Sequence, residues 1–221
     1  EIIDHTRHTE PAGTFEEADA RRMQIVKSEK NIELFLNHYA FAVKKEGDSI
    51  AEVIALNTRT NECRRFAGRL FADCTGHGTI GSLAGADYDM TIDGHSGTTN
   101  KWAWSQTNSP QLFPETPWAL DLDIKDFPYP AEQGGGWEWQ SGFYKHPIDD
   151  LEYIRDWNLR AIFGAWNAMK NKSGAKDHKN AKLDWVAHIA GPRESRRLFG
   201  DIILNEQHIK TGHAFPDGLV P

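Results

Sequence analysis

Hydrophobic and polar positions divide the first part of the chain into a helix and several strands. Apolar residues recur at helical spacing over residues 15–30, and Thr14 with Glu17 forms a capping box at the start of this segment. Residues 32–47 and 49–58 are rich in β-forming side chains, and the turn sequence EGDS joins them. The pattern therefore predicts a helix followed by a β-hairpin.

The strand pattern continues up to a glycine-rich turn. A short strand within ECRRFAG precedes a stronger one, Arg69–Cys74, and we interpret Cys74 as a buried free thiol. The sequence TGHGTIG follows at residues 75–81 and spells Gly-x-Gly-x-x-Gly, and a helix can begin within it. A dinucleotide-binding fingerprint also needs a second parallel strand with an acidic end about 20 residues further on. No buried β-run lies there, so the glycines are not expected to cradle a pyrophosphate.

The middle of the chain is rich in Trp, and a long helix follows it. Short pieces over 91–146 alternate with period two, so Trp102 and Trp104 would share one face of a strand. Trp137 and Trp139 would share one face of another strand. Residues 147–171 then predict a helix with an apolar stripe. The stripe contains Leu151, Ile154, Asn158, Ala161, Ile162, Ala165 and Met169. LDWVAHIA predicts a further strand, and NEQHI a short capped turn or helix.

Charge and composition narrow the classes of partner. The 221 residues carry a net charge of -7, which argues against nucleic acid as a partner, because phosphate backbones are bound by clustered Lys and Arg. No apolar run reaches the roughly 20 residues that span a bilayer, so no membrane partner is expected. The two Cys and the scattered His form no metal-type spacing, so no metal site is predicted.

The glycine-rich turn resembles a segment of a known family. FADCTGHGTIGSLAGADY is similar to DATG-x-G-x-x-x-x-LAGA of the FAD-dependent oxidoreductases of the glutathione-reductase-like superfamily. In that family a β-hairpin excursion leads back to the flavin domain, and the returning strand ends close to FAD. The resemblance implies that Thr75, Gly76, His77 and Gly78 line the cofactor site, where glycine permits a close backbone approach. His77 stands where the family commonly has aspartate.

A second stretch carries a stronger resemblance. GPRESRRLFGDIIL is similar to the G-x-RESRR-x-x-GDY-x-L signature of one branch of bacterial FAD-dependent oxidoreductases, some of which are labelled "xanthan lyase". The resemblance implies a mixed α/β and α+β fold that is part of a two-domain FAD-binding enzyme. We expect a flavin-domain portion over 1–90, a Trp-rich substrate or cap subdomain over 91–182, and a return to the flavin domain over 183–221.

Candidate roles in the RESRR segment follow from its charge. Three Arg and one Glu within six residues beside an apolar strand are costly unless they are paired or used. Arg193 or Arg196 would hold an anionic substrate group or stabilise the charge of reduced flavin. The resemblance places Glu194 and Ser195 near the cofactor. The alternative is a structural ion-pair network around Glu194.

Histidine and tryptophan supply the remaining candidates. His188 and His213 flank the RESRR segment, and we expect His213 to accept a proton when a hydroxyl is oxidised, the alternative being a surface or packed histidine. Four Trp are expected either to form a stacking floor for a sugar-like substrate or to fill the core of the middle subdomain. They are Trp102, Trp104, Trp137 and Trp139.

The two resemblances imply an enzyme, an FAD-dependent oxidoreductase that transfers a hydride from a small-molecule substrate to FAD. A carbohydrate-type substrate is an expectation from the genomic company of the resembling branch. One alternative is a non-catalytic carbohydrate-binding module that uses the Trp-rich middle. Another is a polysaccharide lyase, for which no base and charge neutraliser on an open groove can be recognised.

In the resembling family, a phosphate-binding segment precedes the part matched here, and a segment that closes over the flavin follows it. We therefore expect these flanking segments of the same protein to be partners of this chain. The chain alone would then self-associate through apolar surface and lack activity. The expected location is the bacterial cytoplasm or periplasm, as a soluble protein.

Overall fold

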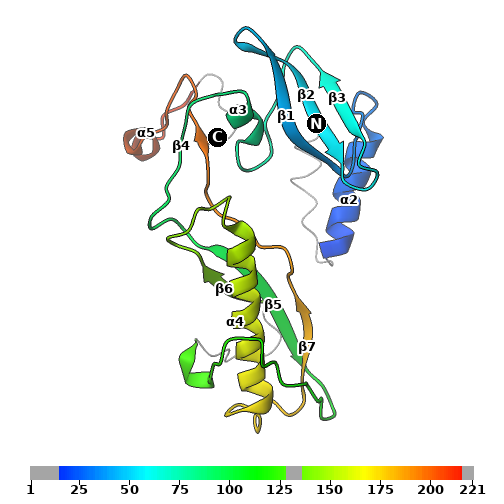
Figure 1. Ribbon diagram of the computed structural model, residues 1–221, viewed down its shortest axis with the longest axis vertical. Coiled ribbons are helices and arrows are strands. Elements are labelled where there is room, and N and C mark those ends of the chain that lie inside the picture. The colour runs from blue at the N-terminus through cyan, green and yellow to red at the C-terminus, as the bar shows by residue number, and fades with distance from the viewer. Residues whose placement is uncertain (1–14, 128–135, 216–221) are drawn as a thin grey trace. The chain divides into compact units, whose positions relative to one another are not determined.

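The computed structural model describes residues 15–127 and 136–215, and the chain divides into two compact units, Glu1–Phe71 and Ala72–Pro221 (Figure 1). Both contain helices and small antiparallel sheets, so the predicted mixed α and β class is confirmed. The finer division into flavin and substrate parts stays a prediction. Among the described residues, no helix is long and apolar enough to cross a membrane.

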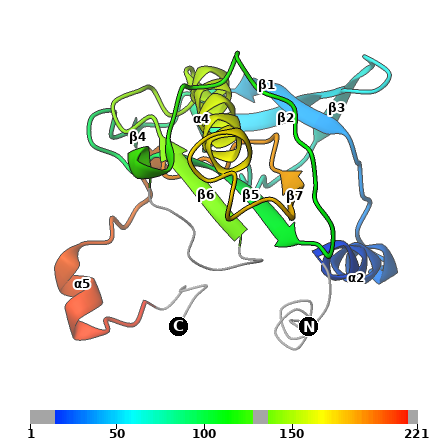
Figure 2. The ribbon, with the colours of Figure 1, turned by 90° about the horizontal axis from the view of Figure 1, so that it is seen from below.

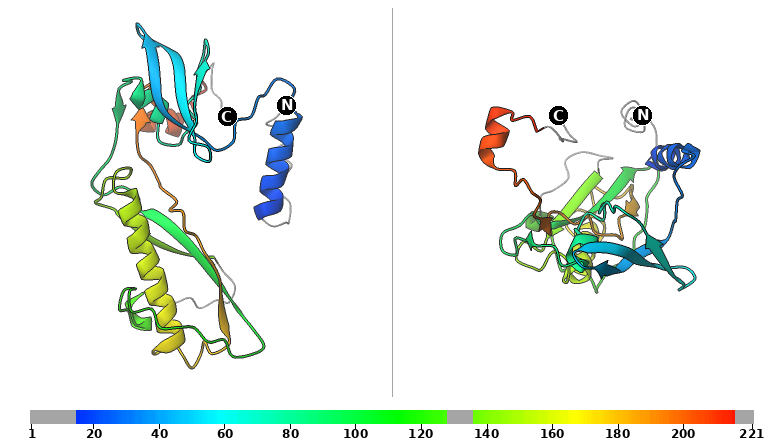
Figure 3. Two further views of the ribbon diagram at one scale, coloured as in Figure 1. Left: turned by 45° about the vertical axis from the view of Figure 1, so that its right-hand side comes forward. Right: turned by 90° about the horizontal axis from the view of Figure 1, so that it is seen from above.

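The first unit contains the predicted helix and hairpin. Helix α2 spans Phe15–Ser28. Strands β1 (His38–Glu46) and β2 (Ser49–Asn57) pair antiparallel across a turn at Gly47, and β3 (Cys63–Ala67) pairs with the other edge of β2 (Figure 3). The turn residues therefore fixed the hairpin as expected.

The stronger strand predicted over Arg69–Cys74 is wrong. Residues 69–74 form no strand, because no segment within 15–127 or 136–215 pairs with them. The interpretation of Cys74 as a buried thiol is also wrong, since this residue is exposed. An apolar run supplies strand propensity, but a strand exists only where a neighbour completes its hydrogen bonds.

The second unit is built on a three-stranded antiparallel sheet covered by one long helix. Its strand order is β6-β5-β7, with β5 at Thr98–Gln106, β6 at Gly136–Ser141 and β7 at Ala181–Val186. Helix α4, Leu151–Asn171, lies along one face of this sheet (Figure 2). Side chains of β5 alternate between buried and less buried, as the period-two pattern predicted.

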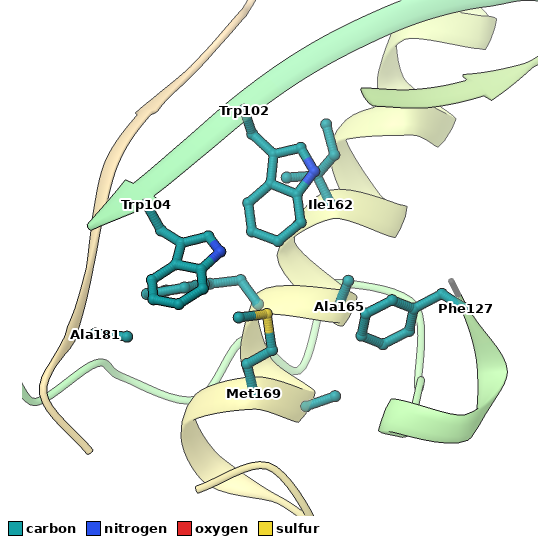
Figure 4. Close-up of a cluster of buried hydrophobic side chains, with 9 residues drawn as sticks. Trp102, Trp104, Phe127, Ile162, Ala165, Met169 and Ala181 are labelled. Atoms are coloured by element: carbon teal, nitrogen blue, oxygen red, sulfur yellow. The ribbon is translucent and has the colours of Figure 1, made fainter. Parts of the chain in front are cut away.

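The main core lies between this sheet and α4. Trp102 and Trp104 of β5 point toward α4, where Ile162, Ala165 and Met169 face them (Figure 4). Trp166 is fully buried, and its ring centroid lies 6.1 Å from that of Trp102 and 6.4 Å from that of Trp104. The predicted apolar stripe of α4 is therefore the face that the sheet covers.

Short elements make up the rest of the second unit. They are α3 (Thr79–Leu83), β4 (Tyr88–Asp89), the 3-10 turn η1 (Ile124–Asp126), β8 (Arg197–Leu198) and α5 (Glu206–Thr211). Strand β8 returns from the end of the unit and pairs antiparallel with β4. The Asn205 side chain caps α5 by accepting a hydrogen bond from the amide of His208 (3.1 Å), as the NEQHI sequence predicted. The pairing of β4 with β8 brings the two sequence motifs into one region.

Candidate functional site

The glycine-rich turn is organised by the carboxylate of Asp73. Its Oδ1 accepts hydrogen bonds from the amide and the hydroxyl of Thr75, at 3.0 and 2.7 Å. Its Oδ2 accepts from the amide of Gly81 in α3, at 3.0 Å. The Thr75 hydroxyl in turn accepts from the amide of Thr79 (3.0 Å) at the start of α3. One aspartate thus joins the chain before the turn to the helix after it.

These bonds set the charge state of Asp73. Burial by itself raises the pKa of this carboxyl, but the hydrogen bonds from Thr75, Gly81 and Ile80 outweigh it and lower the pKa below its ordinary value of 3.8. A carboxyl whose pKa is lower in the folded state stabilises that state above the unfolded pKa. Its contribution is lost as the pH falls through the folded value.

We therefore expect Asp73→Ala to lower the free energy of unfolding by about 1–3 kcal/mol at neutral pH, because donors of the turn lose a charged acceptor. The gap between wild type and variant should be constant above about pH 4 and should shrink below it. Urea unfolding of both proteins at a series of pH values measures this. A gap that stays unchanged down to pH 2 would contradict the assigned role.

The RESRR segment meets the glycine-rich turn directly. Ser195 is 3 % exposed, and its hydroxyl oxygen lies 2.7 Å from Nδ1 of His77, 118 residues earlier in the chain. Arg196 donates from its guanidinium to the carbonyl oxygen of His77 at 3.3 Å, and it lies over the ring of Tyr88, 5.4 Å from its centroid. The two motifs that carry the family resemblance therefore form one structural region.

Glycines of the turn serve different purposes. A Cβ on Gly81 would lie 2.3 Å from Leu198 Cδ1, and one on Gly78 would lie 3.1 Å from Leu198 Cγ, so both positions accommodate this leucine of β8. Gly76 differs, because its φ is +79° and nothing lies within 4 Å of the position of an added Cβ. Gly76 therefore presents bare backbone to open space.

Charged groups of the RESRR segment differ in their contacts and in their exposure to solvent. Glu194 accepts a hydrogen bond from the amide of Ser96 at 3.1 Å, and this bond is the main cause that lowers the pKa of its carboxyl. The charges of His95 and Arg193 lower that pKa further. Arg193 itself is exposed, and no ion pair joins it to a carboxylate in the described residues. Of the two arginines considered, Arg193 is therefore the one open to an anion from solution.

The four candidate Trp lie mostly on the core side of the sheet. Trp102 and Trp104 are 2 % and 3 % exposed, and Trp139 packs half-buried against the same cluster. Neither Trp102 nor Trp104 has a face free for a ligand, which agrees with the core alternative for these two. Trp137 lies in β6, opposite Trp102 in the register, and its side chain is outside the described residues.

The two candidate histidines lie on exposed segments. His188 follows β7 and is exposed. His213 follows α5, and its ring packs against His208 (centroids 5.3 Å apart) and Phe215 (4.5 Å). The structure gives no contact between His213 and the turn at 75–81. Its role as a base stays a prediction.

Two residues of this region escaped the sequence analysis. Asp73 carries a local signal, because an aspartate two residues before a threonine is typical of a side-chain-capped turn. Leu198 carries none, since its contact with Gly81 depends on the return of β8. The described sheets contain only antiparallel pairs, so the turn does not follow a parallel strand as a dinucleotide fingerprint requires. No group of His, Cys, Asp and Glu suited to a metal ion occurs within 15–127 and 136–215.

Comparison with known proteins gives one match. The family model described as FAD dependent oxidoreductase matches residues 4–220. No match was found among curated proteins, and none among solved structures. The family match spans both units and both motifs described above.

Proposed function

The chain belongs to the family of FAD dependent oxidoreductases, whose cofactor is FAD, and we propose that the turn Thr75–Gly78 and the segment Arg193–Arg197 form one wall of its flavin site. The observation that carries this proposal is the contact of Ser195 and Arg196 with His77. Two motifs far apart in sequence meet there, and both resemble segments of flavoenzymes.

The residues present fit a flavin. Thr75 and Gly76 are exposed at the surface of the turn, and an added Cβ at Gly76 would project into open space that a planar ring system can enter. Exposed Arg193 offers a permanent positive charge beside this wall, which suits a phosphate or an anionic ring. Arg196 is partly buried, and its guanidinium donates to the turn at His77, so it serves to hold the turn.

The proposed reaction is the oxidation of a small, carbohydrate-type molecule. FAD, when bound, supplies the hydride acceptor, and the protein supplies position and charge. Arg193 would neutralise negative charge at the site, and Ser195 would fix the orientation of the His77 ring. His213 is proposed as the group that takes the proton of the substrate hydroxyl. The resemblance of the RESRR segment supports the substrate class.

A non-catalytic carbohydrate-binding module is the alternative function. It requires Trp side chains that are open to a sugar on the Trp-rich sheet. Trp102 and Trp104 are buried and do not meet that requirement. Membership in an oxidoreductase family favours the enzyme. A lyase remains the weaker proposal, since nothing in the described region pairs a base with a charge neutraliser in a groove.

Gly76→Ala tests the proposed wall. A Cβ at this position would enter the space reserved for the flavin, so we expect FAD affinity to fall by about tenfold or more, equivalent to roughly 1.4 kcal/mol. FAD fluorescence and visible absorbance follow the titration. It should be run on this chain and on a version extended at both ends, because flanking segments are proposed partners.

Gly94→Ala is the matched control. Gly94 has a φ of +77° and also has nothing within 4 Å of an added Cβ, so both variants carry the same backbone strain of about 1–2 kcal/mol. FAD affinity of the Gly94 variant should stay within about twofold of wild type. Equal losses in the two variants would mean that strain alone is responsible. Absence of FAD binding in both the short and the extended wild-type protein would refute the proposed flavin wall.

A further inference from the structure

A pocket lies between the first turns of α4 and the chain that follows β6, and it shares no residue with the proposed flavin wall. It has a volume of about 180 Å³ and is open to solvent. It is lined by Ser141, Gly142, Lys145, Tyr153, Ile154 and Trp157. Sites for drug-sized ligands measure roughly 300–1,000 Å³, so this pocket is suited to a single ring.

Two aromatic side chains form the wall of this pocket. Tyr153 and Trp157 are four residues apart on α4 and therefore lie on the same side of the helix. Both rings are partly open to solvent, with 55 % and 39 % of their residues' surface exposed. An exposed pair of aromatic rings at helical spacing is an apolar platform that the core does not need.

A cation lies over each ring. The ammonium of Lys145 is 4.8 Å from the centroid of Tyr153, and the guanidinium of Arg160 is 5.7 Å from the centroid of Trp157. Within 15–127 and 136–215, Lys145 has no carboxylate at ion-pair distance. Asp156, on the same helix, is paired with Arg155 at 2.8 Å. The Lys145 charge is therefore available to an anionic ligand.

The backbone around Lys145 is fixed by its neighbours. Its amide donates to the carbonyl oxygen of Gly142 at 3.0 Å, and its own carbonyl oxygen lies 2.9 Å from Nε2 of buried His95. Gly142 has a φ of +87°, and a Cβ there would lie 2.6 Å from Ile154 Cδ1. The turn that carries Lys145 is thus packed against Ile154 of α4 and fixed by the hydrogen bond to His95, as a preformed site requires.

We propose that this pocket binds one sugar ring that bears a carboxylate. The apolar C–H face of such a ring packs on aromatic side chains, and its hydroxyls stay in the water at the open side. Lys145 then meets the carboxylate at the pocket edge. The positive charge of Lys145 at the pocket disfavours a cationic ligand. This site is separate from the proposed flavin wall, and the inference does not rest on the proposed function.

Isothermal titration of the full chain with methyl β-glucuronide and methyl β-glucoside tests the inference. The two ligands differ only at C6, which is a carboxylate in the glucuronide and a hydroxymethyl group in the glucoside. We expect the glucuronide to bind roughly two- to fivefold more tightly, the range of an exposed ion pair. Lys145→Gln should abolish this preference without changing glucoside binding. Trp157→Ala should weaken both ligands by roughly tenfold, because the stacking surface is lost.

Tyr144→Ala is the control, since Tyr144 is 76 % exposed beside Lys145 but does not line the pocket. It should leave both affinities unchanged, and circular dichroism should show all variants folded. FAD binding should be the same in Trp157→Ala and wild type, which separates this site from the flavin. Equal binding of the two glycosides by wild type, tighter binding of benzoate than of glucuronide, or no binding would each overturn the inference.

Discussion

Replacing Trp166 by alanine is expected to lower the free energy of unfolding of the second unit by about 3–5 kcal/mol. Trp166 is fully buried and packs between Trp102, Trp104 and Phe113, with ring centroids 5.9–6.4 Å away. Truncation would leave a cavity at the centre of the core, and the sheet and α4 cannot move close enough to fill it. Urea unfolding followed by circular dichroism measures the loss.

Trp166→Phe should cost much less. The indole Nε1 of Trp166 is buried without a hydrogen-bond partner, so the smaller phenylalanine removes an unsatisfied donor while it keeps most of the apolar contact. Trp185→Ala is the control, because Trp185 is 43 % exposed, and we expect a change of under about 1 kcal/mol. A loss in Trp166→Phe as large as in Trp166→Ala would show that the donor is satisfied in solution.

The second large effect is expected at Asn158, a polar residue buried on α4. Its amide nitrogen donates to the carbonyl oxygen of Thr98 at 3.0 Å and to Oδ1 of Asn100 at 3.1 Å. Its amide oxygen accepts from the hydroxyl of Ser141 at 2.5 Å. Asn158→Leu would keep the volume but leave these groups unpaired, so we expect a loss of about 3 kcal/mol or more.

Asn171→Leu provides the comparison on the same helix. Asn171 is exposed, so its replacement should change stability by less than about 0.5 kcal/mol. Urea unfolding of both variants gives the two values. If Asn158→Leu were as stable as wild type, the network between β5, β6 and α4 would contribute nothing beyond packing.

Local patterns predicted most elements of the fold because they are set by neighbours in sequence. The stripe on α4 and the alternation in β5 each identify one face, and the structure buries those faces. The strand predicted over 69–74 failed because pairing depends on a distant partner. Alternation likewise placed Trp102 and Trp104 on one face, but only the position of α4 decides that this face is dry.

The candidate site was less accessible to sequence analysis. Resemblance alone pointed to both motifs, and nothing in either motif predicts that Ser195 meets His77. That contact follows from the pairing of β4 with β8, which depends on the whole second unit. Asp73 was missed although its turn is local, because the apolar run before it suggested a strand.

The contact between His77 and Ser195 also has a consequence during synthesis. The two residues are 118 positions apart, and ribosomes add about 5–20 residues per second, so the glycine-rich turn waits roughly 6–24 s for its partner. In that interval Gly81 lacks its contact with Leu198, and His77 lacks its hydrogen bond with Ser195. The β6-β5-β7 sheet and α4 can form first. This brings together the segment before β5 and the segment after β7, which lowers the entropy cost of closing the loop between His77 and Ser195. Nascent chains that end before residue 198 should therefore contain a packed core, while their glycine-rich turn lacks its partners.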